Sequence, residues 1–263
     1  MIILFFIISF LSCIIGAICG IGGGVIMKPV LDAFHMAPVS VISFLSGCSV
    51  LAMSVISFGK NLKAGREIIK KSTLLAVGAA IGGLLGKSGF QSAMIFFGDD
   101  RIVGLGQSII MFILNTGVLL YTVSKVNITT LQVSNKGLCL LIGLALGTLS
   151  AFLGIGGGAI NIMMLCCFFS MGTKEAGVAS LNIIMLSQLT GLGNTLIFRN
   201  IPVFGIRQLF VMIAGGILGG SMGHYIKSEI TEKHVERLFI MALVLIIIIN
   251  VYNIYQFAFV LVV

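Results

Sequence analysis

Long apolar runs that contain no Lys, Arg, Asp or Glu dominate the sequence. These runs are residues 1–27, 36–59, 102–124, 137–173, 176–198 and 238–263. A helix needs about 20 apolar residues to cross the hydrocarbon core of a bilayer, and every run is long enough. Two further segments, 72–90 and 207–226, are apolar with a single charged residue each. The pattern therefore predicts an all-α integral membrane protein with about eight transmembrane helices.

The run 137–173 is too long for one crossing, because its 37 residues would form a helix of about 55 Å. It contains the segment GIGGG at 154–158, and the same five residues follow the first apolar run at 20–24. Glycine adopts positive φ angles and leaves the backbone bare. Each segment therefore predicts a helix break inside the membrane followed by a half-helix, which spans 24–34 in the first copy.

The repeated glycine segment divides the chain into two similar halves. We expect a first transmembrane repeat at 1–125, a cytoplasmic linker at 126–136 and a second repeat at 137–263. Four crossings in each half would make the repeats parallel, whereas a half-helix that changes the crossing number to an odd one would make them inverted. We expect eight crossings and parallel halves.

Basic residues give the chain a formal net charge of +8, and they lie between the apolar runs. The densest cluster consists of Lys60, Lys63, Arg66, Lys70 and Lys71. Short basic loops of membrane proteins face the cytoplasm, so loop 59–71 is expected there, and with eight crossings both termini as well. A site for phosphate or lipid headgroups is the alternative for this cluster. Nucleic acid is not an expected partner.

The composition agrees with a membrane protein, because 58% of the residues are hydrophobic and 9% are charged. Six cysteines lie in or beside apolar runs, at positions 13, 19, 48, 139, 166 and 167. Their spacing does not suggest a metal site, and we expect no metal and no cofactor. Buried small side chains are the simpler interpretation, and a sulfur-handling role stays open for Cys48 and for the Cys166-Cys167 pair.

Two charged residues, Lys28 and Asp32, interrupt the apolar sequence after the first glycine segment. Their spacing of four places them on one helix face, and charges at membrane depth mark functional sites by default. Lys28 either faces a cavity and offsets the charge of an anion, or it reaches toward the interface and pairs with Asp32. Asp32 is accordingly a candidate charge partner or coupling residue.

Helix ends at the two breaks would add donors for an anion, since backbone N–H groups and the helix dipole favour negative charge there. Asn161 lies one position before the equivalent of Lys28 in the second copy. The candidate substrate-binding residues are Gly22, Gly23, Gly24, Lys28, Ser49, Gly156, Gly157, Gly158, Asn161 and Asn182. Glycines at spacing four, at 78, 82 and 86 and at 215, 219 and 223, predict close helix packing.

The glycine segments, together with Ser46-Gly47-Cys48-Ser49 and Ala179-Ser180-Leu181-Asn182, resemble the sulfite exporter TauE/SafE family over the whole chain. The first copy matches the family pattern through Pro29, whereas the second has no proline in residues 159–170. The resemblance implies a permease of the bacterial cytoplasmic membrane for small sulfur-containing or organic anions.

The function expected from these features is transport of a small anion across the bilayer. A negative cytoplasm favours anion efflux by about 2.3 kcal/mol per charge per 100 mV, so export needs no coupling ion. Uptake by the same architecture and a non-transporting assembly subunit are the alternatives. An enzyme is disfavoured because the three histidines are scattered. A homo-oligomer is compatible with the sequence.

Overall fold

The structure is a computed structural model, and it describes residues 2–61, 66–124, 130–133, 135–198 and 201–260. Within these residues it contains ten α-helices and no strand. The helices are α1 Ile2–Cys19, α2 Gly24–Ala33, α3 Val39–Asn61, α4 Arg66–Phe97, α5 Asp100–Ser124, α6 Lys136–Leu153, α7 Gly158–Phe169, α8 Thr173–Ile197, α9 Ile206–Glu229 and α10 Glu232–Tyr255, which continues into a π-helical turn at Gln256–Val260. Eight of them, all but α2 and α7, are long and apolar enough to cross a membrane. The expected all-α membrane fold is confirmed.

Both predicted helix breaks are present, and glycines with positive φ form them. Between α1 and α2, Gly20 and Gly22 have φ angles of 80° and 71°. Between α6 and α7, Gly154, Gly156 and Gly157 have φ angles of 67°, 81° and 67°. Side chains rarely tolerate this conformation, so the helices end where the GIGGG segments begin and the short helices α2 and α7 follow.

The glycines at spacing four pack directly against other helices. A Cβ added at Gly78 would overlap the Leu140 carbonyl of α6, and one at Gly86 would overlap the Thr148 carbonyl. On α9, a Cβ at Gly219 would lie 2.5 Å from the Phe10 carbonyl oxygen of α1. The predicted close packing is confirmed. Because the contacted residues of α6 rise in number together with the glycines of α4, these two helices run parallel.

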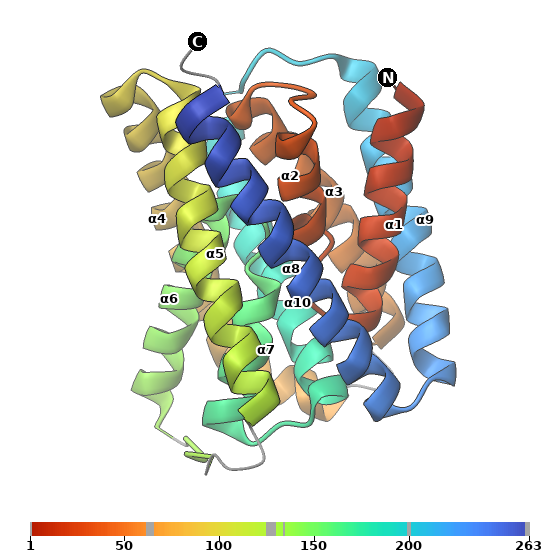
Figure 1. Ribbon diagram of the computed structural model, residues 1–263. Helices are drawn as coiled ribbons and strands as arrows, with labels where there is room; N and C mark the ends of the chain where they lie inside the picture. The colour runs from red at the N-terminus through yellow and green to blue at the C-terminus, as the bar shows by residue number, and fades with distance from the viewer. Residues whose placement is uncertain (1, 62–65, 125–129, 134, 199–200, 261–263) are drawn as a thin grey trace.

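The directions of the helices correct the expected parallel halves. Helix α9 runs parallel to α1 and also to α3, because its Gly216 and Gly220 face Ser49 and Met53. Therefore α1 and α3 have the same direction, and the short α2 returns the chain between them (Figure 1). After this return, the chain crosses the bundle three times in the first half, through α3, α4 and α5. Because three is odd, the second half begins on the opposite face and has the opposite orientation.

Contacts in the second half agree with this reversal. Helix α8 runs parallel to α4, since Asn182 bonds to Ser72 and Asn194 bonds to Ser88. Because α6 is parallel to α4 as well, α7 returns the chain between α6 and α8, as α2 does in the first half (Figure 1). The segments α1–α5 and α6–α10 thus have the same order of elements in opposite orientations. The domain boundaries stay a prediction, and residues 126–129 and 134 of the expected linker lie outside the described residues.

The start of α1 and the end of α10 lie on one face of the bundle, and the end of α3 and the start of α4 lie on the other (Figure 1). The predictions that loop 59–71 and both termini are all cytoplasmic therefore cannot hold together. The error comes from the two half-helices, each of which returns the chain to the face it came from. Residues 62–65 of this loop lie outside the described residues. Arg207, at the start of α9, lies on the face of the termini.

Most basic residues lie at the face of the α3–α4 connection. Lys60 ends α3, Lys136 begins α6, Lys174 begins α8, and Lys233 and Arg237 begin α10. By the positive-inside rule we expect this face to be the cytoplasmic one. We therefore expect both termini on the opposite side of the membrane.

This orientation predicts which introduced cysteines react in intact cells. Gly59→Cys should resist a membrane-impermeant maleimide until the cells are permeabilised, because it lies beside the basic loop. Val203→Cys, in the exposed connection between α8 and α9, should react at once. The parent protein gives the background from the native cysteines. Rapid labelling of Gly59→Cys in intact cells, together with no labelling of Val203→Cys, would show that the protein has the opposite orientation.

The helix contacts predict the effect of bulk at a packing glycine. Gly82→Leu should destabilise the protein by about 1–3 kcal/mol or more, because the side chain must push α6 away from α4. The matched control is Gly117→Leu on α5, where an added Cβ meets no atom of the described structure within 4 Å. Thermal unfolding of the purified variants measures the difference. Equal stability of the two variants would contradict the packing described here.

Candidate functional site

The two helix breaks contact each other at the centre of the bundle. A Cβ added at Gly24 would lie 2.5 Å from the Ile155 carbonyl oxygen, and one at Gly158 would overlap the Ile21 carbonyl. The contact is therefore reciprocal, with each half-helix beginning against the backbone of the other break. The two glycine segments therefore meet inside the protein. Any larger residue at these two positions would force the breaks apart.

Neighbouring side chains around the breaks come from both halves. An added Cβ at either Gly22 or Gly156 would approach Val50 of α3 and Ile184 of α8. The breaks are thus enclosed by one crossing helix from each half. Gly23, the residue before α2, has a right-handed helical conformation, whereas the equivalent Gly157 before α7 has a left-handed one, so the two breaks are similar without being identical.

Serine hydroxyls line the second break, and only some of them have partners. Ser46 of α3 donates to the Gly154 carbonyl at 3.0 Å. Ser43 lies beside the same glycine and Ser150 lies beside Gly157, yet both of these buried hydroxyls lack a hydrogen-bond partner in the described structure. They are available to a polar ligand at the break.

Asn161 is the clearest unsatisfied side chain of the candidate site. It lies in the first turn of α7, is fully buried, and neither its amide nitrogen nor its amide oxygen has a partner in the described structure. Leaving a buried polar group unpaired costs about 1–3 kcal/mol. A polar ligand that bonds to this amide would recover that cost.

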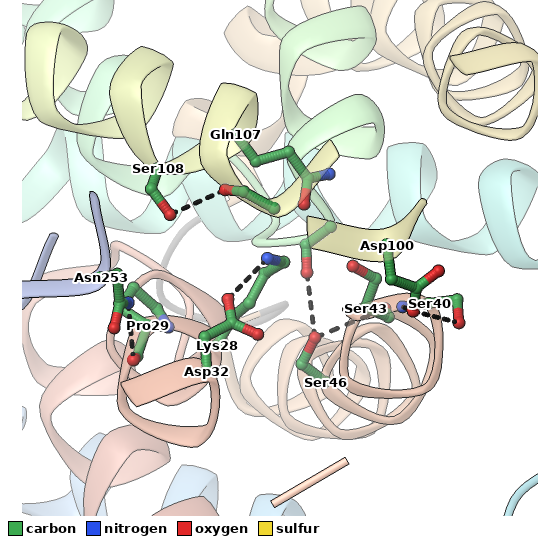
Figure 2. A network of polar contacts seen from close by, with 12 residues as sticks. Lys28, Pro29, Asp32, Ser40, Ser43, Ser46, Asp100, Gln107, Ser108 and Asn253 are labelled. Atoms are coloured by element: carbon green, nitrogen blue, oxygen red, sulfur yellow. Dashed lines mark hydrogen bonds and ion pairs between the residues drawn. The ribbon is translucent and has the colours of Figure 1, made fainter. Parts of the chain in front are cut away.

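Lys28 and Asp32 form an ion pair inside the protein. The Lys28 Nζ lies 2.8 Å from Asp32 Oδ2, and the side chains are 1% and 3% exposed. Figure 2 shows the ammonium and the carboxylate pointing toward one another. The structure thus contains the pairing with Asp32 that the sequence suggested, but Lys28 is enclosed by protein and does not extend toward an interface. The second carboxylate oxygen of Asp32 has no hydrogen-bond partner among the described residues.

Helix α10 contributes to the same region. The Asn253 amide donates to the Pro29 carbonyl at 3.0 Å (Figure 2). This bond connects the last crossing helix to the half-helix that carries Lys28. The sequence did not indicate Asn253, since a lone asparagine in an apolar helix has no local pattern that marks its partner.

The other two candidate residues differ in their surroundings. Ser49 is fully buried, and its hydroxyl has no partner in the described part of the chain. Asn182 instead donates to Ser72 Oγ at 3.0 Å, which connects α8 to α4. Asn182 is thus engaged in helix packing, whereas Ser49 is available.

The centre of the protein is closed in this conformation. The cavity beside the breaks has a volume of only about 10 Å³ and is lined by residues that include Val25, Asn115 and Gly157. That is about the space required by one water molecule. In this conformation the space beside the breaks therefore admits nothing larger than a water molecule.

Two buried lysines were not predicted as functional. Lys87 of α4 and Lys227 of α9 are 6% and 5% exposed. Lys87 is the one charged residue in the segment 72–98, and this isolated charge in an apolar segment could have marked it as a candidate functional residue. Lys227 lies near the charged end of its helix, where sequence patterns suggest only a residue at the interface.

Comparison with known proteins identifies the chain. Residues 5–250 match the family described as Sulfite exporter TauE/SafE. Comparisons with curated proteins and with solved structures gave no match. The match covers nearly all of the chain and agrees with the eight apolar helices. This multi-pass membrane protein belongs to the sulfite exporter TauE/SafE family of transporters.

Proposed function

We propose that the protein is a permease for small anions, sulfur-containing ones such as sulfite or sulfonates or other organic anions, and that it exports them. The observation that supports this proposal best is the buried amide of Asn161, in the first turn of α7 after the second break, which has no hydrogen-bond partner among the described residues. Discontinuous helices that meet at the centre of opposed halves form the binding sites of many transporters.

The candidate site would bind the anion through several donors. The Asn161 amide and the hydroxyls of Ser43 and Ser150 would replace part of its hydration shell. Backbone N–H groups at the start of α2 and α7 would add the positive ends of two helix dipoles. Opposed halves that rock around this contact would open the site to one face and then to the other.

The Lys28–Asp32 pair explains how an empty site tolerates a cation. Asp32 neutralises Lys28 when no substrate is bound, so no charge is stranded in the protein. An arriving anion would compete with Asp32 for the ammonium. The membrane potential would then drive the anion outward by about 2.3 kcal/mol per charge per 100 mV.

Substitution of Lys28 tests the pair. Lys28→Met leaves the Asp32 carboxylate buried without a cation, which should destabilise the protein by about 3–5 kcal/mol. Lys28→Met combined with Asp32→Asn should restore most of that stability, because no charge remains. Thermal unfolding in detergent measures both effects.

Transport separates the two roles of Lys28. Flux into proteoliposomes, normalised to folded protein, should stay near background in the stable double variant and return in part with Lys28→Arg, which keeps the charge. Full flux in the double variant would show that Lys28 serves stability alone.

Asn161→Leu tests the central site directly. The substitution removes the amide at similar volume, so the protein should remain as stable as the parent or become more stable while anion flux falls by about tenfold or more, the loss expected for one or more hydrogen bonds. Asn250→Leu is the control, since that buried amide donates to the Ile246 carbonyl of its own helix. Thermal-shift screening with sulfite, sulfate, thiosulfate, sulfoacetate and simple carboxylates would identify the substrate. Unchanged flux in Asn161→Leu would exclude this amide from the route.

A further inference from the structure

Lys87 lines a cavity that shares no lining residue with the small one beside the helix breaks. The cavity has a volume of about 320 Å³ and is lined by residues from α3, α4, α8 and the α8–α9 connection, among them Ser40, Lys87, Thr195 and Pro202. The start of α3 and the α8–α9 connection place it on the side of the chain termini. It is the size of a small ligand site, unlike the closed space at the breaks.

Lys87 lies deep in this side of the bundle. It precedes the end of α4 by ten residues, or about 15 Å of helix, and its side chain is 6% exposed. In the described residues no carboxylate oxygen lies within 4.0 Å of its ammonium, whereas Lys28 has Asp32. Its observed contact is with the Phe90 ring, 4.9 Å from the ammonium to the ring centroid. An uncompensated cation at membrane depth indicates a functional partner.

The walls of the cavity indicate what that partner is. Phe90, Met94, Ile201 and Pro202 present apolar surface. Two hydroxyls of the lining are already engaged, since Ser40 donates to Asp100 at 3.2 Å and Thr195 donates to the Gly191 carbonyl at 3.2 Å. The Asp100 carboxylate beside Ser40 (Figure 2) disfavours a second negative charge on a ligand.

We propose that this cavity binds a monovalent organic anion, a sulfonate or carboxylate, through Lys87 and holds its short apolar substituent against Phe90, Met94 and Pro202. The inference rests on the proposed permease function for its meaning, because the cavity lies on the side of the chain termini and would be the vestibule that an exported anion enters after it leaves the breaks.

Chemical labelling tests the vestibule without transport. Met94→Cys places a thiol on the cavity wall, and Ser92→Cys places one in a neighbouring hollow of the same helix that no lysine lines among the described residues. The measured quantity is the ratio of modification rates by a sulfonate-bearing and a trimethylammonium-bearing methanethiosulfonate, followed by peptide mass spectrometry. This ratio should be about tenfold higher in the Met94→Cys variant than in the Ser92→Cys variant. Adding Lys87→Met should abolish the difference, and adding Lys87→Arg should keep it.

Protection by alkanesulfonates tests the apolar wall. Each methylene added from methanesulfonate to butanesulfonate should lower the concentration that protects the thiol of Met94→Cys by about fourfold, and the protection should vanish when Lys87→Met is added. The vestibule proposal would be overturned if the thiol of Met94→Cys did not react, or if the ratio of modification rates did not depend on Lys87. Protection that is independent of chain length would overturn the assignment of an organic anion. Because flux is not measured, failure here differs from failure of the permease function, which Asn161→Leu tests.

Discussion

The contact between the two broken helices is the constraint on which the rest of the structure depends. Gly24 lies against the Ile155 carbonyl, and Gly158 lies against the Ile21 carbonyl. A membrane offers no water to free backbone groups, so irregular backbone must be enclosed by protein. The breaks enclose one another, and this is possible only because neither half-helix begins with a side chain. The bundle therefore has to bring the two halves together in opposite orientations around this point.

Close packing elsewhere maintains that arrangement. The glycines at spacing four hold α4 against α6 and α9 against α1, so each pair combines one helix from each half. Van der Waals contact rather than the hydrophobic effect drives helix association in lipid, and bare backbone maximises it. Two of the hydroxyls that stay unpaired within the described residues, those of Ser43 and Ser150, lie beside the glycines of the second break.

Local patterns predicted the elements but not their directions. The charge-free runs and the GIGGG segments were enough to predict the crossing helices and both breaks, because hydropathy and glycine conformation act within a few residues. The direction of α2 depends on its contacts with distant parts of the chain. One of these contacts is the hydrogen bond from Asn253 to Pro29, which joins residues 224 positions apart. Lys28 and Asp32 were predicted from spacing four within one helix, whereas the bond from Asn182 to Ser72 joins different helices and no pattern revealed it.

Lys28 and Lys87 show how one protein can hold cations in two electrostatic states. Lys28 is enclosed beside the breaks and is neutralised by Asp32 at 2.8 Å. Lys87 lines a larger cavity, and the Phe90 ring, 4.9 Å from its ammonium, reduces the cost of its charge. An enclosed cation without a counter-ion would be expensive, and an accessible one with a counter-ion would attract no anion. In the proposed route, the anion would compete with Asp32 for Lys28 at the closed centre and would be held by Lys87 in the open cavity.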